Sequence, residues 1–224
     1  MVALCGIAVI IIASLYGGYK KGMVKMVLSC IALLATMIIV GVLSPIVTKA
    51  VKNTDSYESV LDSTEKRLVK EGVFKEGNIE DIIERLNVPD EIKNYLLDSN
   101  TVKKYAQLNV DNANDYIVHS IANIIVSALV FVVLFIIVYV CINIIISTLD
   151  LISKLPLING INKLGGAVLG AAEGLLLVWL FFIGLNIFSN TEFARFVFED
   201  INRNAVASFI YDNNLILKVV LKLL

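Results

Sequence analysis

Residues Ile117–Leu149 read IVHSIANIIVSALVFVVLFIIVYVCINIIISTL, a run of thirty-three residues without an Asp, Glu, Lys or Arg. The surface of a soluble helix carries charged side chains on at least one face, and this run offers none. A helix needs about 20 apolar residues to cross a hydrocarbon core of about 30 Å. The run is therefore long enough to span a bilayer and to project beyond it, which predicts an integral membrane protein.

Three further apolar runs flank this stretch. They are Val2–Tyr16, Met23–Leu43 and Leu164–Phe188, and we expect Ser44-Pro45 to end the second. The first becomes long enough to span when it is extended to Tyr19, and it lacks the basic start of a secretion signal, so we expect it to be retained. The sequence thus predicts an all-α integral membrane protein with about four transmembrane helices.

Composition supports this fold class. Apolar residues make up 58% of the chain and charged residues 17%, and the mean hydropathy is +0.81. Soluble domains carry about 25% charged residues. The net charge of −1 gives no basic surface for nucleic acid. Residues 49–115 hold 24 of the 39 charged side chains, so this segment is expected to lie in water.

The charge pattern predicts four parts of the chain. Residues 1–48 form a transmembrane hairpin, residues 49–115 a small helical extramembrane insertion, and residues 116–189 the third and fourth spans. Residues 190–224 alternate charged and apolar side chains at helical spacing, which is typical of amphipathic helices at a membrane interface. Within the insertion, the Leu and Ile faces of its helices are expected to pack on each other.

The tip of the first hairpin is basic. It contains Lys20, Lys21, Gly22 and Lys25 and no acidic residue. Cytoplasmic loops of membrane proteins carry an excess of Lys and Arg, so this tip is predicted to be a cytoplasmic hairpin. With four spans, both termini and the insertion then lie on the opposite side.

The fourth span has a glycine face. Gly166, Gly170 and Gly174 recur every four residues, so they line one side of a helix. Missing side chains let another helix approach closely, and we interpret these glycines as helix-packing residues. The alternative is that they make room for a conduit or for a helix of a partner.

Glu173 is the candidate functional charge, because it is the acidic residue placed well inside a predicted span. A charge there costs at least about 2.5–3.5 kcal/mol, so its carboxylate should face protein or water. It is either a structural residue near the interface or a carboxylate that handles a proton or an ion. The predicted partners are Lys25 and the polar side chains of the third span: His119, Asn123, Ser127, Asn143 and Ser147.

No set of residues with catalytic spacing is present in the sequence. The one histidine, His119, lies near the polar edge of the third run, so we expect no Ser–His–Asp or Cys–His set. Cys5, Cys30 and Cys141 lie in apolar runs without metal-ligand spacing. We therefore expect no enzyme, no cofactor, no metal and no nucleic-acid partner. The expected partners are the lipid bilayer, a membrane or envelope protein bound through residues 49–115, and a second copy of the chain.

Two stretches resemble a known family. Tyr16–Lys25, leading into Leu28-Ser29, is similar to the first hairpin of the colicin V production protein (CvpA) family, and Asn162–Gly174 is similar to that family's polar-basic pair followed by glycines. The order of the four apolar runs also fits. The 49–115 insertion is longer than the short loop of compact members. The resemblance implies a multi-pass protein of the bacterial inner membrane, associated with toxin production or export and with envelope maintenance.

Two functions follow as hypotheses. The first is an accessory or scaffold factor for export of colicin V and for envelope homeostasis, which predicts a tightly packed bundle with a partner-binding patch on the insertion. The alternative is a small oligomeric channel or transporter for an ion or small solute. In that case the glycine face and Glu173 should line a cavity that opens to both sides.

Overall fold

The computed structural model describes residues 2–74, 78–86, 88–98, 112–148, 160–187 and 191–223, and within this part it contains helices and no strand. Among the described residues, four helices are long and apolar enough to cross a membrane. They are α1 (Val2–Lys21), α2 (Met23–Val51), α7 (Ala113–Thr148) and α8 (Gly160–Ile187). The predicted fold class, an all-α membrane protein with about four spans, is confirmed.

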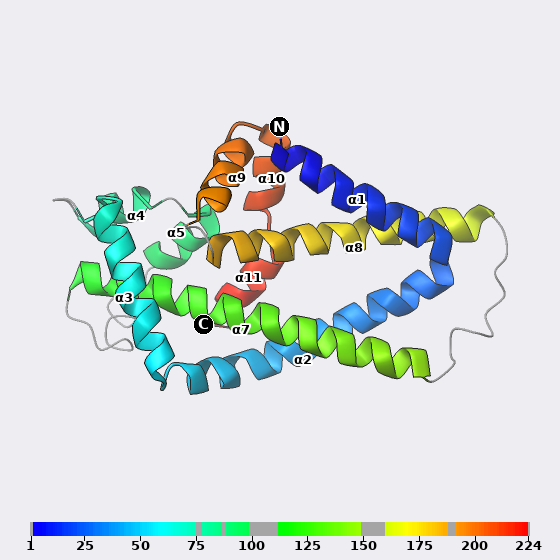
Figure 1. The fold of residues 1–224 in the computed structure, drawn as a ribbon, viewed down its shortest axis with the longest axis horizontal. Coiled ribbons are helices and arrows are strands. Elements are labelled where there is room, and N and C mark those ends of the chain that lie inside the picture. The colour runs from blue at the N-terminus through cyan, green and yellow to red at the C-terminus, as the bar shows by residue number, and fades with distance from the viewer. Residues whose placement is uncertain are drawn as a thin grey trace.

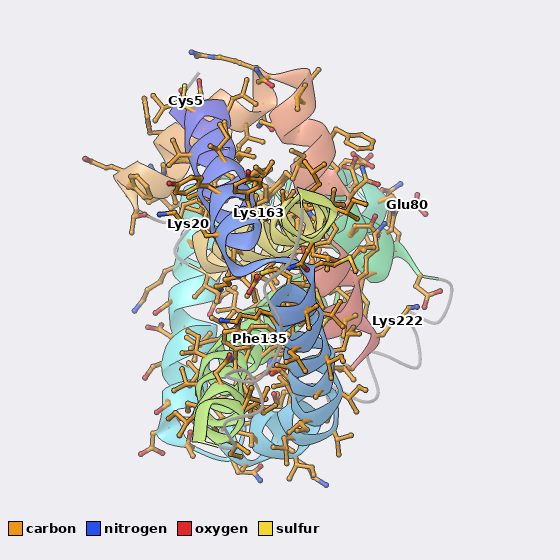
Figure 2. All side chains as sticks on the ribbon, turned by 90° about the vertical axis from the view of Figure 1, so that its right-hand side faces the viewer. Cys5, Lys20, Glu80, Phe135, Lys163 and Lys222 are labelled. Carbon is orange, nitrogen blue, oxygen red and sulfur yellow. The ribbon has the colours of Figure 1, made fainter. Side chains whose placement is uncertain are left out.

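The four long helices form two pairs (Figure 1). α1 runs along α8, which is the most extensive contact between any two described helices, and α2 runs along α7. The tip of the α1–α2 hairpin and the start of α8 lie at one end of the molecule. Figure 2 looks onto that end and labels Lys20 of α1, Lys163 of α8 and Phe135 of α7. The Lys163 ammonium lies 5.7 Å from the centre of the Tyr19 ring of α1.

The prediction that Ser44-Pro45 ends the second span is wrong. Helix α2 continues through Pro45 to Val51. Proline removes one backbone hydrogen bond and can cost a helix about 3 kcal/mol. However, Val40, Ser44 and Thr48 recur every four residues and are all buried. The packed face of α2 therefore extends past the proline, and tertiary contact outweighs the local signal.

Helix α7 is 36 residues long and projects beyond the other spans into the insertion. The insertion contributes α3 (Asp55–Lys70), α4 (Ile79–Glu84) and α5 (Asp90–Leu97). The Tyr57 hydroxyl of α3 donates to Asn123 Oδ1 of α7 over 2.7 Å, and the Tyr116 hydroxyl of α7 donates to the Leu96 carbonyl over 3.1 Å. α7 is thus the central element of this end of the molecule.

These contacts correct one expectation about the insertion. α4 packs on α5, as expected, but α3 packs on α7, and α5 also contacts the C-terminal tail. The apolar face of α3 therefore packs outside the insertion, whereas α5 contacts both α4 and the tail. α4 begins with a capping box, in which the side chains of Asn78 and Asp81 each accept the other residue's backbone N–H.

The tail forms α9 (Glu192–Asn202), α10 (Ala205–Asp212) and α11 (Leu215–Lys222). α9 and α10 contact α1, and α11 contacts α5, α7 and α8. The Trp179 indole N–H donates to the Ile210 carbonyl over 3.0 Å, and the Tyr211 hydroxyl donates to Asn186 Oδ1 over 2.8 Å. The tail is amphipathic, as predicted, and the structure adds that its apolar side packs on the spans.

Asn214 joins the tail to α8. Its side chain is 1% exposed, donates from Nδ2 to the Trp179 carbonyl over 3.0 Å, and accepts the Leu217 N–H as the cap of α11. We predict that Asn214→Ala lowers the free energy of unfolding by about 1–3 kcal/mol, since it removes a helix cap and a buried hydrogen bond between the tail and α8. Thermal unfolding and protease cleavage of the tail would measure this loss.

Asn213→Ala is the matched control for Asn214→Ala. Asn213 is exposed and its Nδ2 bonds only the Phe209 carbonyl of its own helix turn. Equal loss of stability in the two variants would show that Asn214 does not anchor the tail.

Candidate functional site

The glycine face of α8 lies directly on the backbone of α1. A Cβ added at Gly170 would lie 3.0 Å from the Gly18 Cα, and one added at Gly166 would lie 2.7 Å from the Gly22 carbonyl carbon. A Cβ at Gly174 would lie 2.9 Å from the Ser14 Cβ. These separations leave no room for a side chain, so the two helices meet through their main chains.

The partners of the glycine face on α1 were missed in the sequence. They are Ser14 and Gly18 of α1 and Gly22 of the turn that follows it, which recur at the same four-residue spacing as the glycines of α8. Small residues at this spacing are typical of closely packed membrane helices. The sequence signal that could have predicted this pairing is the match between the two small-residue repeats at four-residue spacing.

Gly22 attaches the hairpin turn to the start of α8. Its φ of +78° lies in the left-handed region that favours glycine, and a Cβ there would lie 2.6 Å from Asn162 Nδ2. The Asn162 side chain accepts the Val24 N–H over 3.3 Å. Of the hairpin lysines, Lys20 lies 4.6 Å above the Tyr16 ring. Thus the two stretches that resembled one family in the sequence contact each other in the fold.

Glu173 joins three helices. Its Oε1 accepts hydrogen bonds from the Ser29 hydroxyl of α2 over 3.1 Å and from the Tyr139 hydroxyl of α7 over 3.0 Å. Of the expected partners, Lys25, His119, Asn123, Ser127 and Asn143 do not bond it in the described part of the chain, and the Ser147 side chain lies outside the described residues. Asn143 does not bond Glu173 itself, but its Nδ2 donates to the backbone carbonyl of Tyr139, whose hydroxyl bonds Glu173. Sequence spacing could not set the register between α2, α7 and α8, and therefore missed Ser29 and Tyr139.

The arrangement around Glu173 is a hydrogen-bonded junction. Both donors are hydroxyl groups, which stabilise a carboxylate without bringing a second charge into the span. Among the described residues, no group of three or more His, Cys, Asp or Glu side chains could hold a metal ion. The geometry therefore supports Glu173 as a residue that holds α8 against α2 and α7.

A second feature lies at the extramembrane end, between α3 and α9. It is a hollow of about 660 Å³, which we call the basic hollow. Its charged lining consists of Lys66, Arg67, Lys70, Arg85 and Arg195, with Glu71 and Glu199. Glu71 is already paired with Arg67 Nε over 3.1 Å. Sequence reasoning missed the hollow because Arg195 lies far along the chain from α3.

The comparisons with known proteins identify one family. Residues 102–212 match the family model described as colicin V production protein. The matched range includes the glycine face and Glu173. It confirms the family that the sequence resembles. Neither the search of curated proteins nor the search of solved structures found a match.

We predict that Gly18→Ala and Gly170→Ala each destabilise the protein, by about 1–3 kcal/mol, because each adds a methyl group between two backbones in contact. The measurement is thermal unfolding of the purified chain in detergent. Gly17→Ala is the control, since its Cβ would meet nothing within 4 Å. Alanine favours a helix over glycine, so the control should be neutral or stabilising. Equal effects at Gly17 and Gly18 would contradict close packing.

Two replacements of Glu173 should distinguish its role as a hydrogen-bond acceptor from the effect of its negative charge. Glu173→Ala leaves the Ser29 and Tyr139 hydroxyls without their acceptor, and we expect a loss of about 1–3 kcal/mol. Glu173→Gln keeps a carbonyl acceptor and should recover most of this stability. Chemical denaturation of both variants in the same detergent measures the difference. If both variants lose the same stability, the charge and not the hydrogen bonding matters.

Proposed function

We propose that this chain, a multi-pass membrane protein of the colicin V production protein (CvpA) family, is an accessory or scaffold factor for toxin production or export and for envelope homeostasis. We place it in the bacterial inner membrane and assign it no catalytic activity. In this role the spans hold an extramembrane surface in place, and that surface binds a partner protein.

The observation that carries this proposal is the closed contact between α1 and α8. A channel that used the glycine face would need open space beside Gly166, Gly170 and Gly174. Backbone atoms of α1 occupy that space. Glu173, the other residue that a channel would use, is bonded to Ser29 and Tyr139. Both features support a packed scaffold over a conduit.

The basic hollow is the surface that we propose for partner binding. It combines α3 of the insertion with α9 of the tail, and five basic side chains line it against two acidic ones. Charge complementarity steers association and favours partners of opposite sign. The proposed partner is therefore a membrane or envelope protein with an acidic extramembrane segment.

A photo-crosslinking amino acid at Ser63, which lines the hollow, should capture a discrete envelope protein in cells. The same group at Ser56, exposed on α3 but not among the residues lining the hollow, is the control. We expect Lys70→Glu with Arg195→Glu to abolish the capture and to reduce toxin export from cells that depend on this chain. Capture that survives the charge reversal would contradict the assigned surface.

Reconstitution into liposomes tests the rejected alternative. We expect the purified chain to pass neither ions nor small solutes, because its glycine face is closed. Solute flux that Glu173→Gln abolishes would overturn the scaffold and favour a channel.

A further inference from the structure

A second hollow lies where the end of α2, the middle of α7 and the end of α11 meet. It has a volume of about 270 Å³, and we call it the α2–α7 notch. Its polar lining includes the hydroxyls of Thr48 and Ser127 and the side chains of Lys49 and Lys52. Val220 and Leu223 of α11 add apolar surface. Neither the junction at Glu173 nor the basic hollow uses these residues.

The two hydroxyls in the notch are buried without a protein partner. Thr48 and Ser127 are each 5% exposed, and neither Thr48 Oγ1 nor Ser127 Oγ bonds any residue of the described part of the chain. Other buried helix threonines bond their own backbone: the Thr36 hydroxyl donates to the Ala32 carbonyl over 2.8 Å. Buried polar groups are nearly always bonded, so these two hydroxyls point to a ligand.

The charge of the notch determines whether that ligand is a cation or an anion. Lys49 and Lys52 line it, and no acidic residue is among its lining side chains. Two ammonium groups repel a cation and attract an anion. Burial lowers the pKa of Lys52, because the ammonium has lost part of its hydration. A neighbouring negative charge would offset that cost.

The position of the notch indicates where the anion comes from. After Lys25 in its first turn, α2 carries no charged residue until its end, where Lys49 and Lys52 precede the polar insertion. Ile46, one turn before, is 64% exposed on the outside of the bundle. This is the depth at which lipid phosphates lie beside a spanning helix, with acyl chains along the apolar surface below. A soluble oxyanion would share the chemistry but would leave Ile46 and Leu223 uncovered.

We propose that the α2–α7 notch binds the phosphate group of an anionic phospholipid. The Thr48 and Ser127 hydroxyls donate hydrogen bonds to the phosphate oxygens, and Lys49 and Lys52 neutralise its charge. The lysines also suit the negative end of the α2 dipole, but that role leaves the two hydroxyls unexplained.

The test uses the full chain purified in a neutral detergent. Its melting temperature is measured with added phosphatidylglycerol, with phosphatidylcholine, and with inorganic phosphate in the absence of lipid. We expect phosphatidylglycerol alone to raise the melting temperature, by several degrees. Lys49→Gln with Lys52→Gln should weaken this effect at least tenfold in lipid concentration. Lys20→Gln with Lys21→Gln removes the same charge from the exposed tip of the α1–α2 hairpin, away from the notch, and should leave it unchanged.

The hydroxyl variant gives a result that a merely structural role would not. Thr48→Val with Ser127→Ala removes two unpartnered groups, so the lipid-free protein should melt at the same or a higher temperature, yet lose the response to phosphatidylglycerol. Equal stabilisation by phosphatidylglycerol and phosphatidylcholine would overturn the proposal. So would an unchanged lipid response in the hydroxyl variant, or an equal response to inorganic phosphate, which would make the ligand a soluble anion.

Discussion

The structure depends on one contact in which two helices touch through their main chains. Along α1 and α8, Gly18 and Gly170 face each other without side chains between them. In lipid there is little hydrophobic drive to associate helices, so close packing and hydrogen bonds must hold a bundle together. The α1–α8 contact supplies the packing, and Glu173 supplies hydrogen bonds from α8 to the second pair through Ser29 and Tyr139. The glycine face and the acidic residue beside it thus connect α8 to all three other spans.

The sequence predicted what depends on hydropathy and missed what depends on register. Four spans, the helical insertion and the amphipathic tail follow from runs of apolar and charged residues. Exposing apolar runs to water, or charged runs to lipid, costs a large free energy, so these runs decide which segments cross the membrane. The partners of Glu173 depend on how far α2 and α7 slide along α8, and no pattern within one helix encodes that distance. The continuation of α2 through Pro45 was missed for the same reason: the packed face formed by Val40, Ser44 and Thr48 becomes visible only with α7 beside it.

The extramembrane elements share one core with the spans. Tyr116 in the first turn of α7 bonds the Leu96 carbonyl of α5, and Lys218 of α11 pairs with Glu91 of α5 over 3.0 Å. Trp179 and Asn214 connect the same tail to α8. The insertion and the tail are therefore held by side chains from the spans. A partner bound at the basic hollow would contact a surface whose position is set by the transmembrane helices.

The pairing of α1 with α8 also constrains how the chain is made. During synthesis α1 enters the membrane before α8, which begins only at Gly160. Until then Ser14, Gly18 and Gly22 present a bare strip of backbone to lipid, with no helix to fill it. The α1–α2 hairpin therefore lacks this partner until α8 has been made, and the α1–α8 contact closes only after that. A chain truncated before α8 would expose this strip and become a target for membrane quality control.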